Sequence, residues 1–325
     1  MSFNRLQPED FLISADSVTA GAWTGNVPTL TEFYTSSVQE AATSGQYFLN
    51  VYQTESANTD AEVQFAIAYG NAAGSGSLLF DSNIDGRSPS SVVYGQFQNI
   101  ILGDESTAFT YGSTTPATQH FYAISVNRAR YKGGILPGSL TLKLASGFAI
   151  TDDSATTNTV SFNEAGRVFN LRSGSAGTID DTDPVYYGLF LPDIGTLLLD
   201  AEALDTKISL STNKNTNVNG QNPQKLFEQI VAQAQFTLNS EEKVTSDYVF
   251  IRARNSEFNY SENPSFITGS TGEVYYSDFI NAPQTFITTV GLYNDTNDLL
   301  AVAKLSKPLK KDFTKEALVR VKLDF

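Results

Sequence analysis

Residues 285–293 read TFITTVGLY and residues 299–305 read LLAVAKL, with the five-residue turn NDTND between them. Two apolar runs that meet across a turn rich in Asn and Asp are typical of a β-hairpin. The chain then closes with ALVRVKLDF at 317–325, in which apolar residues alternate with Arg320, Lys322 and Asp324. Alternation with a period of two predicts a strand with one buried face, so the C-terminus is expected to be held in a sheet.

The composition of the whole chain agrees with this strand-rich end. Its 325 residues include 23 Gly, 15 Tyr and 22 Phe, and 41% of all residues are hydrophobic while 17% are charged. Aromatic residues favour strands, glycines favour turns, and this balance of apolar and charged residues is typical of a globular protein. We therefore predict a mainly β fold, in which antiparallel sheets form a β-sandwich-like body.

Two short stretches show helical periodicity instead. From about 89 to 102, Ser88 is the expected cap and Pro89 suits the first helical position. From about 223 to 235, Asn222 is the expected cap. The apolar stripe of the second stretch consists of Leu226, Phe227, Ile230, Val231 and Ala234. Because apolar residues recur three and four positions apart in both stretches, the sequence predicts two short helices.

Shifts in composition suggest four segments. Residues 1–35 are polar and interrupted by Pro and Gly, and they contain the only tryptophan, Trp23; we interpret them as an N-terminal arm, with a first strand pair as the alternative. Residues 36–150 form a β-rich lobe with one helix, and 151–240 form a polar insertion or second lobe with the other helix. Residues 241–325 are expected to form a C-terminal β module that packs on the first lobe. The alternative is two sequential lobes that divide near residue 150.

Charge and residue usage exclude several classes of function. The formal net charge of −14 disfavours nonspecific nucleic-acid binding, which depends on neutralising phosphates. The absence of cysteine excludes disulfides and thiolate chemistry. No apolar run approaches the ~20 residues of a membrane span, and the first ten residues lack the features of a secretory signal. We expect synthesis in the cytoplasm, with neither nucleic acid nor membrane as a partner.

The sequence offers no motif for catalysis. His120 is the only histidine, and no Gly-x-Ser-x-Gly elbow, phosphate-binding loop or EF-hand spacing is present. Carboxylates cluster at 152–153, at 180–183 and in the turn at 295–298, where they suit polar turns. Calcium at Asp180–Asp183 stays an alternative. We therefore expect no catalytic residues, no cofactor, no metal and no enzymatic activity.

Two features instead indicate contacts with other proteins. Lysines concentrate between Lys304 and Lys315 in an otherwise acidic chain, which suits either the protection of a sheet edge or docking to an acidic neighbour. The segment 255–264 is rich in Asn and contains two aromatic residues, which suits either a subunit contact or a purely structural loop. The predicted contact residues are Arg252, Arg254, Glu257, Phe258, Tyr260, Lys304, Lys307, Lys310 and Lys311.

Four stretches resemble a known family of proteins. They are VGLYND at 290–295 followed by LLAVAKL at 299–305, RNSEFNYSENPSF at 254–266, YGLFLPDI at 187–194 and NRARYK at 127–132. The chain resembles virion structural proteins of T4-like bacteriophages, particularly those that infect marine cyanobacteria. Because these stretches are spread over much of the chain, the resemblance is not confined to one module.

The resemblance implies a location rather than a chemistry. It implies a structural protein of the phage tail, in the baseplate or at the attachment of fibres, which is made in the host cytoplasm and acts by assembly. Its partners would be other tail subunits, or itself in a symmetric assembly. Three alternatives stay open: a receptor- or carbohydrate-binding tail protein, a polysaccharide-degrading tail enzyme, and a capsid or neck subunit.

Overall fold

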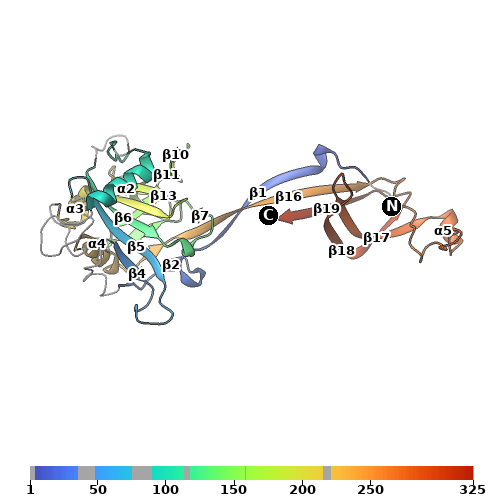
Figure 1. Ribbon diagram of the computed structural model, residues 1–325, viewed down its shortest axis with the longest axis horizontal. Helices are drawn as coiled ribbons and strands as arrows, with labels where there is room; N and C mark the ends of the chain where they lie inside the picture. Colours follow the sequence, from blue (N-terminus) through green and yellow to red (C-terminus); the bar gives the residue numbers. More distant parts are fainter. Residues whose placement is uncertain are drawn as a thin grey trace. The chain divides into compact units, whose positions relative to one another are not determined.

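The computed structural model describes residues 4–35, 48–74, 90–104, 106–112, 118–157, 159–214 and 221–324, and it divides into two compact units (Figure 1). Unit 1 comprises Met1–Asp16 and Lys243–Phe325, and unit 2 comprises Ser17–Glu242. Strands β1 (Phe11–Gly21) and β16 (Asn239–Ala253) each begin in one unit and end in the other.

Unit 2 contains most of the regular structure. Its helices are α2 (Ser90–Leu102), α3 (Ala201–Ile208) and α4 (Gln221–Val231). Its strands are β2 (Thr29–Leu30), β3 (Tyr34–Thr35), β4 (Phe48–Tyr52), β5 (Val63–Asn71), β6 (His120–Val126), β7 (Gly134–Ile135), β8 (Thr141–Lys143), β9 (Ala149–Asp152), β10 (Ser161–Asn163), β11 (Gly166–Ser175), β12 (Thr178–Ile179), β13 (Tyr186–Leu191), β14 (Thr196–Asp200) and β15 (Phe236–Thr237).

Thirteen of these strands form one sheet, which curls back on itself. Its main path runs β2-β15-β8-β9-β11-β13-β14-β6-β5-β4-β3, so β2 and β3 lie at opposite edges. Only residues 31–33 separate these two strands along the chain, so four Cα steps bring the edges within about 14 Å of each other. The ring centroids of Phe65 in β5 and Phe236 in β15 are 5.3 Å apart although six strands lie between β5 and β15 in the sheet. The curl therefore encloses a core.

The two faces of the curled sheet carry two hydrophobic clusters. The larger cluster lies inside the curl and includes Trp23, Phe65 and Phe236, with Leu204 of α3 and Leu226 of α4 buried in it. The smaller cluster lies on the other face, where α2 packs over β5 and β6 (Figure 1). Because both faces are covered, central strands such as β14 consist of buried residues throughout, which explains their continuous apolar runs.

Unit 1 is built from long strands. Strand β19 (Ala317–Asp324) pairs antiparallel with β16 from Ala253↔Ala317 to Ser246↔Asp324, and β1 pairs with the other edge of β16. Strands β17 (Gln284–Tyr293) and β18 (Leu299–Asp312) form a separate hairpin (Figure 1). The helix α5 (Asp278–Asn281) is a single turn in the connection before the hairpin. The C-terminal hairpin and the final strand thus form where the sequence predicts them.

The predicted fold class is confirmed: the protein is mainly β, with antiparallel sheets. The helix predicted at about 89–102 is α2, whereas its expected cap and first residue, Ser88 and Pro89, lie outside the described residues. The helix predicted at about 223–235 is α4, which ends at Val231; Ala234 has a left-handed φ of +48°. Its expected cap, Asn222, lies inside the helix, where its side chain bonds the backbone N–H and carbonyl of Asn213.

Of the expected segment boundaries, the one at 241 nearly coincides with the start of the second part of unit 1 at Lys243, and the others differ. The boundary near residue 150 falls within β9, which pairs with β8 and β11 in the middle of unit 2. Residues 17–35 belong to unit 2, because Trp23 is buried in its core and its indole Nε1 donates to the Phe236 carbonyl at 2.8 Å. Helix α3 was not predicted; Asp200 caps it by accepting from the Glu202 and Ala203 N–H groups. The packing of the C-terminal module on another lobe stays a prediction.

Candidate functional site

Unit 1 differs from unit 2 in how little apolar surface it buries. Among the described residues, 44 buried apolar residues lie in unit 2, and only Val249, Ala253, Ala317 and Val321 lie in unit 1. Both hydrophobic clusters of the described structure consist of unit 2 residues alone. A small β structure needs a hydrophobic face packed on another layer to be stable. Unit 1 therefore leaves most of its described apolar residues half-buried or exposed.

The hairpin of β17 and β18 shows this exposure on its outer face. Burial alternates along β17, so that Phe286 is 58% exposed while its neighbour Ile287 is half-buried. On β18, Val302 is 55% exposed and shares the outer face with Lys304 and Lys310. Burial thus alternates along the hairpin, but neither face is fully covered.

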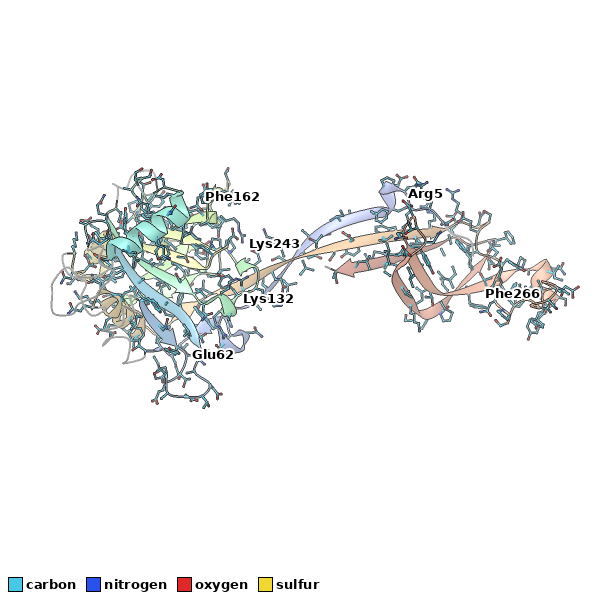
Figure 2. The ribbon with its side chains drawn as sticks, in the orientation of Figure 1. Arg5, Glu62, Lys132, Phe162, Lys243 and Phe266 are labelled. Atoms are coloured by element: carbon cyan, nitrogen blue, oxygen red, sulfur yellow. The ribbon has the colours of Figure 1, made fainter. Side chains whose placement is uncertain are left out.

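A second exposed group lies in the connection between β16 and β17. We call Tyr260, Phe266, Tyr276 and Phe279 the aromatic patch (Figure 2 labels Phe266). Its ring centroids are 5.6 Å apart for Tyr260 and Phe266, 5.3 Å for Phe266 and Phe279, and 6.0 Å for Tyr276 and Phe279. Tyr260 is 52% and Tyr276 is 64% exposed. Sequence reasoning identified Tyr260 but missed the other three, whose only signal is the density of aromatic residues between 266 and 279.

The structure contradicts the predicted role of Lys311 as a contact residue. Its side chain is fully buried, so it cannot lie on a docking surface. Its Nζ donates to the Asn255 carbonyl at 3.0 Å, to Oδ1 of Asn259 at 2.8 Å and to the Asp312 carbonyl at 3.1 Å. These three acceptors use all the hydrogens of the ammonium group, which is what allows a charged group to be buried. Lys311 thus fastens the irregular segment 255–259 onto β18.

The same segment is fastened at further points. The Thr285 hydroxyl donates to the Phe258 carbonyl, and Phe258 itself is half-buried with a left-handed φ of +56°. Glu257 Oε2 accepts from the Arg254 N–H at 2.9 Å and from the Asn4 side chain at 3.1 Å. Both hydrogen bonds lower the pKa of the Glu257 carboxyl, and the bond from the Arg254 N–H has the larger effect. The structure thus holds the segment in one conformation, with Phe258 partly inside and Tyr260 outside.

The remaining predicted contacts lie at the surface. Arg252 and Arg254 are exposed at the end of β16, where Asn4 also donates to the Arg252 carbonyl at 3.2 Å. Lys304, Lys307 and Lys310 are exposed on β18, and Lys310 Nζ lies 3.9 Å from Asp312 Oδ2. The structure places Lys310 and Lys311 on opposite faces of one strand, and only Lys310 is exposed.

The charge of the chain is divided unevenly between the units. Unit 2 holds 10 of the 21 basic residues and 22 of the 35 acidic ones, which gives a formal net charge of −12. Unit 1 holds 11 basic and 13 acidic residues, a net charge of −2. The unit with the nearly balanced net charge is thus also the one with the exposed apolar residues.

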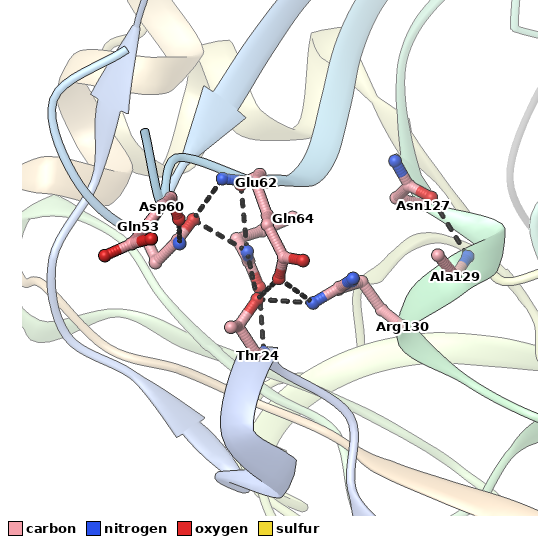
Figure 3. A network of polar contacts seen from close by, with 8 residues as sticks. All are labelled: Thr24, Gln53, Asp60, Glu62, Gln64, Asn127, Ala129 and Arg130. Atoms are coloured by element: carbon pink, nitrogen blue, oxygen red, sulfur yellow. Dashed lines mark hydrogen bonds and ion pairs between the residues drawn. The ribbon is translucent and has the colours of Figure 1, made fainter. Parts of the chain in front are cut away.

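Unit 2 contains polar networks that connect segments distant in sequence. In the network of Figure 3, Glu62 Oε2 accepts from the Thr24 hydroxyl at 2.7 Å and from Arg130 Nη1 at 2.6 Å. The Thr24 hydroxyl bond, followed by the Arg130 contact, lowers the pKa of Glu62. The buried Gln64 side chain bonds the Thr24 hydroxyl and N–H as well as Gln53. This network joins the segment before β2 to β5, a structural role.

The carboxylates considered as calcium ligands already accept hydrogen bonds from neighbouring residues. Asp180 accepts from the Thr182 N–H and hydroxyl within its own turn. Asp183 Oδ2 accepts from Lys207 Nζ at 2.7 Å and from the Tyr187 hydroxyl at 2.8 Å. Burial alone would raise the pKa of Asp183, but the Lys207 and Tyr187 bonds outweigh it and lower the pKa. Within the described ranges, no three His, Asp or Glu side chains are grouped to hold a metal ion.

The single histidine is a core residue. His120 is 5% exposed at the start of β6, with its ring centroid 6.2 Å from that of Tyr69. Burial and, next, the Lys214 charge lower the pKa of its imidazole.

Helices long and apolar enough to cross a membrane are absent from the described part of the chain. No family model, curated protein or solved structure matches the chain.

Proposed function

We propose that this chain is a structural subunit that acts by assembly, and that unit 1 is the part that docks onto other subunits. The observation that carries the proposal is the contrast in burial: unit 1 has only four buried apolar residues among those described, against 44 in unit 2. Small domains gain their stability from buried apolar surface, and unit 1 has little of its own. A neighbouring subunit that covers the hairpin and the aromatic patch would supply what is missing.

The assembly that we propose is a bacteriophage tail, at the baseplate or at the attachment of fibres. Support comes from the resemblance of four stretches of sequence to virion proteins. Two of these stretches lie in unit 1: residues 254–266 contain Tyr260 and Phe266 of the aromatic patch, and residues 290–305 contain the turn of the hairpin. Half of the resembling stretches thus lie in the unit that exposes apolar residues, and the other two lie in unit 2. The protein would be made in the host cytoplasm and would act without a cofactor.

The proposal is tested on particles purified from the cells that produce the chain. Mass spectrometry should find the chain at a fixed ratio to the other particle proteins. Hydrogen exchange should be fast at β17 and β18 in the free chain and slow in the particle, because docking covers the hairpin. A chain that is abundant in the cells and absent from the particles would overturn the proposal.

The aromatic patch supports a second candidate function, the binding of a carbohydrate receptor. Exposed aromatic rings with polar rims form binding surfaces, and Tyr260 and Tyr276 are each more than half exposed. Two outcomes separate the candidates. Changing Tyr260 and Tyr276 to Ser should leave incomplete particles if the patch is a subunit contact. The same changes should leave complete particles that fail to adsorb if the patch binds a receptor.

A further inference from the structure

The two strands of the hairpin have very different edges. Among the described strands, β17 pairs with β18 alone, so its other edge is open. The ten residues of β17, QTFITTVGLY, include no charged residue and no proline. Strand β18 carries Lys304, Lys307, Pro308 and Lys310. Lysines and prolines on an edge strand prevent pairing with other chains, and a long uncharged edge invites it. The hairpin is therefore protected on one side only.

We propose that two copies of this chain pair through the open edges of β17, antiparallel and about a two-fold axis, so that two hairpins form one four-stranded sheet. The inference rests on the proposed function and names its partner, a second copy of the chain. An edge strand whose N–H and C=O groups lack partners on one side can add a strand from another molecule, which is a common mode of recognition. In a two-fold arrangement both copies use the same surface, as in most dimers.

The protected edge of β18 decides which pairing forms. If β17 of one copy paired with β18 of the next, the contact would be head-to-tail and would build rings or filaments. Pro308 has no N–H to donate to such a ladder, and the lysines of β18 would stand beside the new strand. Pairing of β17 with β17 avoids both obstacles. The asymmetry of the hairpin thus favours a closed dimer.

The charges of the hairpin select the antiparallel orientation. The turn carries Asp295 and Asp298, whereas the other end of β18 carries Lys307 and Lys310. Antiparallel pairing brings the acidic turn of each copy toward the basic end of the other, while parallel pairing places the two acidic turns together. Two or three strand spacings separate these charges, about 10–14 Å, which is comparable to the screening length of physiological salt. The attraction is therefore modest, and it sets orientation more than affinity.

Exposed aromatic residues favour the same orientation. Phe286, near the start of β17, is 58% exposed, and Tyr293, at its end, is 40% exposed. Antiparallel pairing brings the Phe286 end of each copy beside the Tyr293 end of the other. Aromatic pairs across neighbouring strands are among the stabilising contacts of sheets. The dimer would thus cover apolar side chains that unit 1 leaves exposed.

A charge placed at the middle of β17 tests the two-fold axis. Thr288 is exposed and lies at the irregularity where β17 has no direct partner on β18. Near the axis, residue 288 of one copy lies close to residue 288 of the other. Thr288→Lys and Thr288→Glu should therefore each raise the dimer Kd by at least about tenfold, because like charges meet in both variants. An equimolar mixture of the two variants should restore dimers, because opposite charges then meet.

Sedimentation equilibrium of the full chain measures these constants, with thermal unfolding as the check that each variant is folded. Ser306→Lys and Ser306→Glu are the matched controls, since Ser306 is exposed on β18 and should leave the dimer Kd unchanged. The inference is overturned if the wild type is monomeric at tens of micromolar. It is also overturned if only one sign of charge weakens the dimer, or if the controls weaken it equally. If the chain is monomeric but still enters particles, only the proposed dimer is contradicted. If the chain forms the dimer but is absent from particles, only the proposed function is contradicted.

Discussion

The two units have nearly the same share of apolar residues but treat them differently. Unit 1 contains 42 apolar residues among 99, close to the 41% of the whole chain. Unit 2 folds its strands into a curled sheet with covered faces, and it holds both hydrophobic clusters of the described structure. Unit 1 arranges its residues in long strands and leaves most of its described apolar residues half-buried or exposed. The share of apolar residues therefore sets how much apolar surface must be buried, whereas the topology decides whether the chain buries it within its own fold.

The largest effect should come from removing a core side chain of unit 2. Phe65 is fully buried, and its ring lies 6.0 Å from that of Trp23 and 5.3 Å from that of Phe236. Phe65→Ala should lower the free energy of unfolding by about 3–5 kcal/mol, because it leaves a cavity. Phe286→Ala, at an exposed position of unit 1, should change it by less than about 0.5 kcal/mol. Urea denaturation of the full chain measures both, and equal losses would erase the contrast between the units.

The next effect concerns Lys311, the one fully buried charged side chain among the described residues of unit 1. Lys311→Met leaves the Asn255 carbonyl and Oδ1 of Asn259 without their donor. An unsatisfied buried acceptor costs about 1–3 kcal/mol, so the segment 255–259 should come loose from β18. Hydrogen exchange at the amides of this segment should therefore accelerate. Lys310→Met is the matched control at the exposed neighbouring position, and equal acceleration in both variants would mean that Lys311 does not fasten the segment.

Sequence patterns predicted strand and helix positions better than the role of single residues. The hairpin at 285–305 follows from two apolar runs that meet across a polar turn, and the final strand follows from alternation. Both are local properties of the chain. Lys310 and Lys311 look alike in the sequence, yet one is exposed and the other buried, because pairing with β17 decides which face each one joins. The location of Trp23 in the core depends on contact with Phe236, more than 200 residues away. Such long-range contacts leave no local signal.

The buried His120 should make the stability of unit 2 depend on pH. Its pKa is lowered in the folded chain, first by burial and then by the Lys214 charge, although Glu202 and Asp205 oppose this. The unfolded chain therefore takes up the proton first as the pH falls below about 6.5. The contribution of His120 to stability is present above that pH and is lost as the pH falls toward the folded pKa. The loss should be smaller than that of a core truncation.

This chain contains one histidine, so proton NMR of its imidazole gives the folded pKa directly. His120→Gln should remove the part of the pH dependence that lies just below pH 6.5, and denaturation midpoints at pH 7.5 and pH 5.5 measure it. Carboxylates titrate at lower pH and serve as the common background of both proteins. An imidazole that titrates at or above 6.5 would show that burial does not control it.

The smallest effect on the free chain, and a large one on assembly, should follow from reversing the charge of the exposed lysines of β18. Lys304, Lys307 and Lys310 have no role in the core, so changing all three to Glu should leave the melting temperature of the chain nearly unchanged. If these lysines meet an acidic neighbour, the variant should enter particles slowly or not at all, with a changed dependence on salt. The matched triple control with the same change in net charge replaces three lysines of unit 2 with Glu. Lys132 is exposed, and Lys143 and Lys225 are half-buried. Normal incorporation of the β18 variant would mean that its lysines only protect a sheet edge. The docking of unit 1 would then depend on its apolar residues alone.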